Sequence, residues 1–306
     1  MQRAAVTQPA SATASAQQHR ATIFIEDAAV LSVRRYAGAQ FVLRLKAPRC
    51  AARATAGSFV HVRCDAAIPM RRPLSIMRAD AAEGWIEVLF KVVGEGLRSL
   101  GNRSAGESVS IIGPIGRGFK ASPARPRALL VGGGVGIPPI IFLAETLHAA
   151  GGAYQPLVLM GSELPFPFQR RPSALPAPWL APAIDSAMQS LEDLAIPSRL
   201  ASLSDFDGCL KGYVTELASR WLDTLSPAER AATEVFACGP TPMLAAVARL
   251  ARQHGVPCQV SLEEYMACAV GGCAGCTVPV QDDDGPAMRR VCVDGPVFDA
   301  ARVFGN

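Results

Sequence analysis

The sequence predicts a chain of mixed class, in which an all-β part is followed by an α/β part and a short cysteine-rich module. Short strands separated by turn residues fill the chain from about residue 29 to residue 113. Apolar strands then alternate with helical patterns over residues 128–253. Three closely spaced cysteines follow near the carboxyl terminus.

The all-β part is typical of a small antiparallel barrel. Alternation places Phe41, Leu43 and Leu45 on one face of a strand. Residues 59–64 and 85–93 are rich in β-branched and aromatic side chains and are expected to form further strands. Glycine-containing turns separate these segments, as short hairpin connections require.

The α/β part predicts a parallel sheet with helices on both faces. Its strands are expected at residues 128–131, 156–160 and 234–238, and its helices at residues 140–149, 212–225 and 242–253. The proline-rich insert from Leu164 to Pro182 is expected to be an irregular loop.

Composition excludes several classes of protein. The net charge of +4 on 306 residues gives no basis for nucleic-acid binding. The longest uncharged apolar run, residues 128–144, contains glycines and adjacent prolines, so we expect no membrane span. Most of the nine cysteines lack the spacing of a disulfide framework, which favours a reducing compartment and a cytoplasmic location.

The cysteines Cys268, Cys273, Cys276 and Cys292 have the plant-type ligand spacing for a [2Fe–2S] cluster. Small residues between the first three allow the backbone to wrap closely around an inorganic core. The alternatives are a four-cysteine zinc site and unrelated core cysteines, but structural zinc usually shows two short cysteine pairs. Because such a cluster carries single electrons, the motif indicates an electron-transfer protein.

A glycine-rich turn in the α/β part predicts a dinucleotide site. Gly134 and Gly136 lie between a predicted strand and a helix, which is the context for cradling a pyrophosphate. The strict G-x-G-x-x-G spacing fails, because Ile137 occupies the last glycine position. Cys238 ends another strand of the same sheet and is a candidate to face a nicotinamide. The alternative for Cys238 is a small buried residue at a turn.

The sequence favours NAD over NADP at this site. Glu163 follows the second strand of the sheet, where an acid binds a ribose hydroxyl and repels a 2′-phosphate. Arg170 and Arg171 lie close by in sequence and argue in the opposite direction.

The barrel part carries two candidate phosphate contacts. Arg71 and Arg72 begin a strand, and paired guanidinium groups bind pyrophosphate oxygens well, although surface arginine pairs are also common. Lys91 ends a strand ahead of a glycine turn at residues 94–96 that opens a short helix, an arrangement that favours an anionic ligand. The alternative for the second motif is a plain strand-to-helix turn.

Together these motifs resemble the ferredoxin–NADP reductase superfamily, and within it the electron-transfer subunits of NAD-dependent dihydroorotate dehydrogenase. The similarity runs from about Ile25 to Asn306, and the motifs occur in the family's order. A cluster module after the nucleotide domain is the specific part. The resemblance implies an antiparallel six-stranded FAD-binding barrel, a parallel-sheet nucleotide-binding domain and a small C-terminal [2Fe-2S] module.

The resemblance also assigns residues and domains. It implies FAD contacts at Arg72, Pro73, Leu74, Ser75, Leu89, Phe90, Lys91, Gly96 and Leu97, and four iron ligands at Cys268, Cys273, Cys276 and Cys292. Family members commonly have Thr or Ser where this chain has Leu97, and often a basic residue where it has Tyr265. The expected domains are a disordered tail at 1–20, the barrel at 21–122, the NAD-binding domain at 123–255 and the cluster module at 256–306.

The implied function is electron transfer from an FMN-containing dihydroorotate dehydrogenase catalytic subunit, through the cluster and FAD, to NAD⁺ in pyrimidine biosynthesis. A hetero-oligomer of two plus two subunits is implied as well. The chain also resembles the small subunit of an NADH-dependent ferredoxin:NADP oxidoreductase and hydrogenase gamma subunits. A zinc-bearing protein without redox activity is the alternative of a different class.

Overall fold

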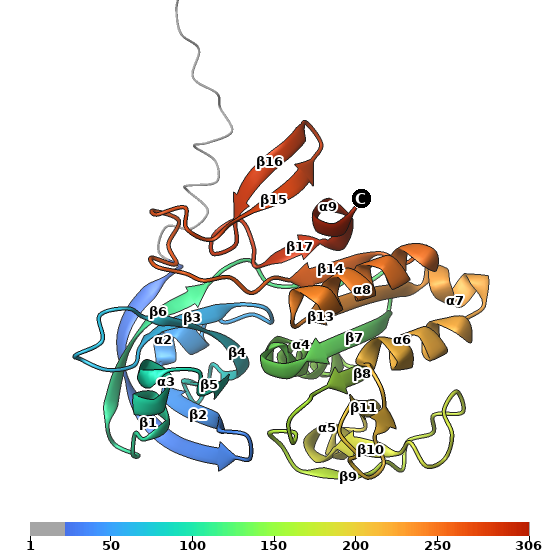
Figure 1. Cartoon of the computed structure of the whole chain (residues 1–306), viewed down its shortest axis with the longest axis horizontal. Helices are drawn as coiled ribbons and strands as arrows, with labels where there is room; N and C mark the ends of the chain where they lie inside the picture. The colour runs from blue at the N-terminus through green and yellow to red at the C-terminus, as the bar shows by residue number, and fades with distance from the viewer. Residues whose placement is uncertain (1–21, 306) are drawn as a thin grey trace, which may run out of the picture.

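The computed structural model describes residues 22–305, so the tail expected at residues 1–20 lies outside the described residues. Figure 1 shows a barrel on one side, a sheet covered by helices on the other, and the cysteine-rich segment above both. The predicted fold class is therefore confirmed. Within the described residues, no helix combines the length and apolar character that a membrane crossing requires.

Six strands of the described chain close into the barrel, in the order β1-β2-β5-β4-β3-β6. Alternate side chains of β2, including Leu43 and Leu45, point into the barrel core, whereas Val42 packs against the core of the neighbouring sheet. The first strand begins at Phe24, ahead of residue 29, where the strand pattern of the sequence begins, and inside the barrel domain expected at 21–122. The elements of the barrel are β1 (Phe24–Tyr36), β2 (Gln40–Lys46), α2 (Pro48–Ala51), β3 (Phe59–Arg63), β4 (Arg72–Asp80), β5 (Trp85–Lys91), α3 (Glu95–Gly101) and β6 (Ser108–Ile115).

The second part of the described chain is built on a seven-stranded sheet in the order β12-β11-β8-β7-β13-β14-β17, in which only β17 runs antiparallel. Along β7, Leu129 and Val131 pack on one face with α6 and α8, while Ala128 and Leu130 pack on the other face with α4. This alternation explains why an apolar run with no polar face forms a strand covered by helices on both sides.

The predicted strands and helices of this sheet are present, with ends shifted by a few residues. The strands are β7 (Arg127–Gly133), β8 (Gln155–Gly161), β11 (Ser198–Ser202), β12 (Leu210–Lys211), β13 (Thr233–Cys238), β14 (Cys258–Ser261) and β17 (Val297–Asp299). The helices are η1 (Gly134–Gly136), α4 (Ile137–Ala149), α5 (Gln189–Asp193), α6 (Val214–Asp223), α7 (Pro227–Ala231), α8 (Thr241–Gln253) and α9 (Ala300–Phe304).

The proline-rich insert is not wholly irregular, so that prediction is wrong in part. Within it, β9 (Arg170–Pro172) pairs antiparallel with β10 (Ser186–Met188). A buried arginine holds part of the remaining loop, because Nη2 of Arg199 donates to the carbonyl of Leu175 at 2.6 Å. Side-chain bonds from elsewhere in the fold therefore order a segment whose own composition favours a loop.

The cysteine-rich segment is fastened to both other parts. Its strands β14 and β17 extend the parallel sheet, so the boundary expected at residue 255 falls between strands of one sheet. On the barrel side, the amide of Arg117 donates to the carbonyl of Gly295 at 2.6 Å. A hairpin of β15 (Thr277–Asp282) and β16 (Gly285–Arg290) projects outward from this anchored base.

Candidate functional site

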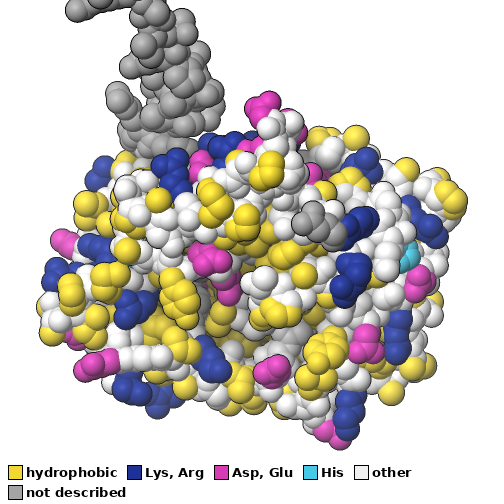
Figure 2. Space-filling view, turned by 45° about the horizontal axis from the view of Figure 1, so that its top comes forward, with side chains coloured by type: hydrophobic (Ala, Val, Ile, Leu, Met, Phe, Trp, Pro, Cys, Tyr) yellow, Lys and Arg dark blue, Asp and Glu magenta, His cyan; other side chains and the backbone are white. Residues whose placement is uncertain are grey.

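A cavity of about 300 Å³ lies where the barrel, the turn after β7 and the segment after β14 meet. Figure 2 shows largely hydrophobic side chains around a hollow between the two halves of the molecule. A volume at the low end of ligand pockets suits a ring system and not a whole dinucleotide. Seven of the residues predicted to contact FAD line it, namely Pro73, Leu74, Ser75, Leu89, Phe90, Lys91 and Leu97.

The other two predicted FAD contacts, Arg72 and Gly96, lie next to each other beside this cavity. A Cβ atom built on Gly96 would stand 3.8 Å from Nη2 of Arg72, so the guanidinium packs against the first turn of α3. Nη1 of Arg72 donates to the carbonyl of Met70 at 3.0 Å, which orients the group. A guanidinium beside a helix start has the positive charge and the hydrogen-bond donors that phosphate oxygens bind, so this pair is a candidate phosphate contact.

Arg71 takes no part in this contact, although it is adjacent in sequence. Successive side chains of a strand point to opposite faces, and the guanidinium of Arg71 turns toward β6. Its Nη1 donates to the carbonyl of Ser110 at 2.7 Å and its Nη2 to the Ser110 hydroxyl at 2.9 Å. Arg71 therefore makes a structural contact, and of the pair only Arg72 stays a candidate to bind a ligand.

The glycine-rich turn lies against the end of β13, as the nucleotide prediction requires. A Cβ atom on Gly136 would stand 2.5 Å from the carbonyl carbon of Cys238, so only glycine permits this approach. Gly134 has φ +55, a conformation that glycine adopts at little cost. The register pairs Cys238 with Gly132, which brings the carboxyl ends of both strands to the edge facing the cavity.

Cys238 is buried, and its environment keeps its thiol protonated. Burial raises the pKa of Cys238 well above the usual range, and the negative charge of Glu263 adds to this effect. A hydrogen bond with Ser261 acts in the opposite direction but does not outweigh burial. Cys238 is thus a neutral group beside the glycine-rich turn. The charge that acts on it belongs to Glu263, which lines the cavity.

Glu263 is a site residue that the sequence reasoning missed. It follows β14 and lines the cavity, together with Ser261, Leu262 and Met266 from the same segment. Solvent reaches Glu263 through the open side, yet protein atoms crowd the carboxyl and their desolvation raises its pKa. The missing signal was β14 itself: its sequence, CQVS, is too short and polar to predict a strand.

The four predicted iron ligands lie on one loop and on the turn that follows β16. The amide of Cys273 donates to Sγ of Cys268 at 3.4 Å, and the sulfurs of Cys276 and Cys292 interact directly. Burial opposes ionisation of Cys268, but amides led by that of Val270 outweigh it and lower its pKa to about 7. Burial and the neighbouring Cys276 sulfur raise the pKa of Cys292.

The arrangement fits a two-iron cluster. In a [2Fe–2S] cluster each iron takes two protein ligands, and the contacts divide the four cysteines into the pairs Cys268–Cys273 and Cys276–Cys292. Over residues 22–305, no group of three or more His, Cys, Asp or Glu side chains is placed so as to hold a metal ion. Amide groups directed at sulfur stabilise the negative charge that such a cluster carries.

Backbone conformation and one arginine shape this loop. Ala269 and Ala274 adopt positive φ angles of 57 and 54, an uncommon conformation that turns successive amides toward the same side. Nη1 of Arg290 donates to the carbonyl of Gly271 at 3.1 Å, and its backbone amide bonds Asp294 at 2.9 Å. Arg290 therefore joins the loop to the return segment before Cys292.

The arginines that argued for NADP are engaged elsewhere. Nη1 of Arg170 donates to the carbonyl of Asp207 at 3.1 Å. Arg171 forms an ion pair with Asp193 at 2.9 Å. Both contacts hold β9 against its surroundings.

Comparison with known proteins identifies close relatives. Residues 263–304 match the family model described as the iron-sulfur cluster binding domain of dihydroorotate dehydrogenase B. The chain is 31% identical over 281 residues to the dihydroorotate dehydrogenase B (NAD(+)) electron transfer subunit of Desulforamulus reducens, covering 90% of this chain and 97% of that protein. The protein of the same name from Geobacillus thermodenitrificans is 33% identical, with 90% and 96% covered.

Solved structures share the fold at lower identity. A chain of the NADH-dependent reduced ferredoxin–NADP oxidoreductase, studied for flavin-based electron bifurcation, matches with a TM-score of 0.72 and 24% identity, covering 91% of this chain and 90% of that one. A ferredoxin–NADP⁺ reductase from Neisseria gonorrhoeae, with bound FAD and NADP, matches with a TM-score of 0.52 and 14% identity, covering 76% and 92%.

Proposed function

Because the chain belongs to the family of dihydroorotate dehydrogenase B (NAD(+)) electron transfer subunits, we propose that it carries electrons from dihydroorotate oxidation in a partner catalytic subunit to NAD⁺. The observation that carries this proposal is the meeting of three features at one place. The cavity of the barrel, the glycine-rich turn and the segment leading to the four cysteines share a common boundary.

Each proposed cofactor has its own set of residues. Pro73, Leu74, Ser75, Leu89, Phe90, Lys91 and Leu97 hold the flavin ring of FAD, and Arg72 with Gly96 holds its pyrophosphate. Gly134, Gly136 and Cys238 form the NAD site, and Cys268, Cys273, Cys276 and Cys292 bind the [2Fe-2S] cluster. Flavin exchanges one or two electrons, which joins a one-electron cluster to two-electron NAD chemistry.

The partner subunit supplies the site at which dihydroorotate is oxidised. We propose that it contains FMN, that two copies of each subunit assemble, and that the complex is cytoplasmic. Two apolar side chains on the segment that carries the cluster ligands are exposed: Tyr265 by 96% and Val270 by 49%. Cys273, which follows them in sequence and precedes the hairpin, is exposed as well. Exposed apolar side chains next to a ligand support docking of the partner on this face.

NAD is the proposed nucleotide. The ion pair of Arg171 with Asp193 and the hydrogen bond of Arg170 to Asp207 leave Glu163 as the proposed ribose contact. The likeness to the NADH-dependent ferredoxin–NADP oxidoreductase concerns the fold alone. It therefore gives no support for that protein's activity in this chain.

The test of this function is a Cys273→Ser variant in complex with the catalytic partner. Loss of one iron ligand removes the cluster, so dihydroorotate-driven NAD⁺ reduction should stop while the partner still reduces an artificial acceptor. Iron content and the visible spectrum of the variant report the cluster directly. Cys209→Ser is the matched control, because this half-buried cysteine lies outside the loop and should leave iron and activity unchanged.

Survival of NAD⁺ reduction in iron-free Cys273→Ser would contradict the proposed route. A colourless wild-type protein that contains zinc would contradict it as well, since zinc has no redox chemistry and no visible absorption.

A further inference from the structure

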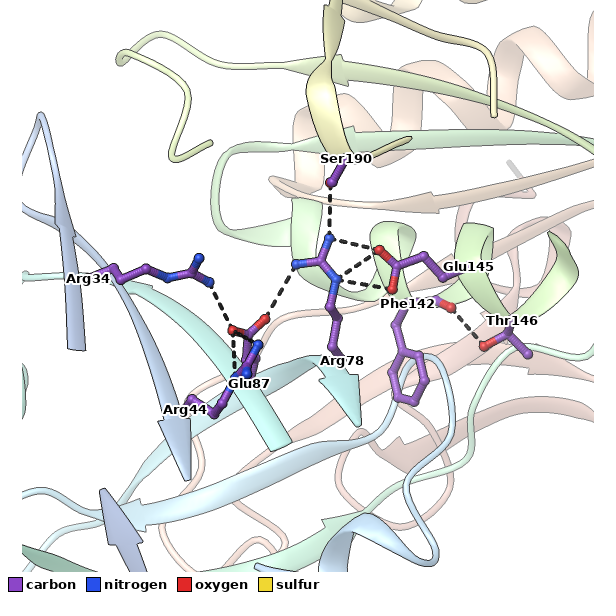
Figure 3. A network of polar contacts seen from close by, with 8 residues as sticks. All are labelled: Arg34, Arg44, Arg78, Glu87, Phe142, Glu145, Thr146 and Ser190. Atoms are coloured by element: carbon purple, nitrogen blue, oxygen red, sulfur yellow. Dashed lines mark hydrogen bonds and ion pairs between the residues drawn. The ribbon is translucent and has the colours of Figure 1, made fainter. Parts of the chain in front are cut away.

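A buried carboxylate on the outside of the barrel organises three arginines. Glu87 of β5 is 1% exposed. Its Oε1 accepts from Arg34 at 2.9 Å and from Arg44 at 2.9 Å, both on barrel strands. Its Oε2 lies 3.4 Å from Nη1 of Arg78 on β4. Figure 3 shows these side chains converging on Glu87.

Arg78 extends this network across the boundary between the barrel and the sheet. Its Nε donates to Oε1 of Glu145, on α4, at 2.8 Å, and its Nη2 lies 2.7 Å from the same oxygen. Nη2 also approaches the hydroxyl of Ser190, at the start of α5, at 3.3 Å. One guanidinium thus contacts the barrel and two helices of the nucleotide-binding part, as Figure 3 shows.

The two elements that Arg78 connects each carry part of the candidate site. Ser75 lines the cavity and lies three residues before Arg78 on β4, about 10 Å along the strand. Gly136 forms the nucleotide turn at the start of α4, about 14 Å along the helix from Glu145. The ion pair therefore joins the strand of the flavin cavity directly to the helix of the nucleotide turn.

An apolar contact accompanies the ion pair and has a different role. Phe142 lies one helical turn before Glu145 and packs against both the barrel core and the sheet core. Apolar contact is non-directional and holds the two parts together. A guanidinium bound on several edges fixes their relative orientation as well, because its hydrogen bonds have a fixed planar geometry.

The burial of this arginine is costly unless its partners are in place. Burial opposes the charge of Arg78, but the hydrogen bonds and charge of Glu145 outweigh it and raise the pKa of Arg78. A buried ion pair contributes little to stability compared with apolar residues of the same size. Its charges are nevertheless tolerated only while the partners keep the geometry that pairs them. This combination is typical of a group that specifies orientation.

We propose that Arg78 is a positioning residue, which through Glu145 and Glu87 sets the orientation of the nucleotide turn relative to the flavin cavity. The inference rests on the proposed function, because it concerns hydride transfer between NADH and a flavin in that cavity. In that step NADH gives a hydride to oxidised flavin, a proton comes from solvent, and NAD⁺ leaves. The transfer is sensitive to the alignment of the two rings.

The test uses the full chain loaded with FAD and cluster, in wild-type form and as Arg78→Met and Glu145→Gln. Stopped-flow mixing with saturating NADH measures the rate of flavin reduction, and a misplacement of about 1 Å should lower it about a hundredfold. Amide hydrogen exchange, measured without nucleotide, should become faster in α4. Arg44→Met is the matched control, because Arg44 binds the other carboxylate oxygen of Glu87, Oε1, but stays within the barrel.

The expected result is a slow, NADH-saturable reduction and faster exchange of α4 in both interface variants, with wild-type behaviour in Arg44→Met. An unchanged reduction rate in Arg78→Met would overturn the proposal, and so would an equal loss in Arg44→Met. If wild-type protein with bound flavin is not reduced by NADH, the proposed function fails instead. In that case amide hydrogen exchange still tests the role of Arg78: exchange of α4 at the wild-type rate in Arg78→Met would reject it.

Discussion

At the scale of single residues, carboxylates with unlike surroundings have unlike roles. Glu87 is buried among arginines and stabilises their charges. Glu263 lines the cavity, desolvation by nearby protein atoms raises its pKa, and its negative charge acts on Cys238. Neither role is visible in the sequence, because each depends on residues brought from distant parts of the chain.

A Glu263→Gln variant should show this difference as a change in pH-dependent stability. The pKa of Glu263 is raised above 4.5 in the folded chain, so the folded state binds a proton more tightly than the unfolded state. Its contribution to stability therefore falls as pH rises from 4.5 through the raised pKa. The variant should be more stable than wild type at neutral pH, and the gain should vanish below pH 4.5.

Thermal unfolding of the cofactor-free chain across this pH range measures the effect. Glu264→Gln removes a charge from the adjacent residue of the same cavity, so the difference between the two variants isolates the position of Glu263. A wild-type and a Glu263→Gln protein with parallel pH profiles would show that the carboxyl is solvated like an exposed one.

At the scale of elements, the backbones of two turns approach each other closely at the proposed nucleotide site. The turn after β7 and the end of β13 are adjacent because both strands run parallel and pair directly. Gly136 has φ −84, which any residue can adopt, so its requirement for glycine is purely steric. The sequence motif fails the strict spacing, yet the geometry it serves is present.

Gly136→Ala should separate these turns. Its Cβ would overlap the Cys238–Gly239 peptide, and such overpacking costs about 1–3 kcal/mol of stability. Chemical denaturation of the cofactor-free chain measures the loss, and NAD titration should show weakened binding. Gly94→Ala is the control for stability, because a Cβ there meets no atom within 4 Å. Equal stabilities of the two variants would contradict the close approach.

At the scale of the whole molecule, the cluster loop is the part that depends on a metal. Its flanking strands β14 and β17 belong to the large sheet, whereas the loop itself is held by Arg290 and by contacts among the cysteines. Without iron, the four cysteine sulfurs lose the cation that balances the negative charge of their thiolates. Metal binding should therefore order the loop without deciding the fold of the barrel or the sheet.

Anaerobic removal of iron by a chelator should confirm this division. Amide exchange over residues 268–276 should become faster, while β7 and β13 keep their protection because their pairing does not involve the loop. Flavin absorption reports the state of the barrel in the same sample. Loss of protection throughout the sheet would mean that the cluster supports the whole fold.

The local patterns of the chain were sufficient to predict most strands and helices, and the four cysteines stay the predicted cluster ligands. Alternation in β2, the apolar run of β7 and the short cysteine spacing are each confined to a few adjacent residues. The short, polar strands β11 and β14 escaped prediction because the sheet around them, and not their own residues, makes them strands. Glu263 was missed for the same reason, because it follows β14 closely.

The sequence by itself therefore determined the class of each part and predicted which cysteines bind iron, since both follow from spacing along the chain. Only the tertiary structure decided that Arg72 packs against the first turn of α3 while Arg71 faces β6, and that Arg78 meets Glu145. Those contacts join residues far apart in sequence, and their partners are selected by packing, burial and strand register, which spacing does not encode.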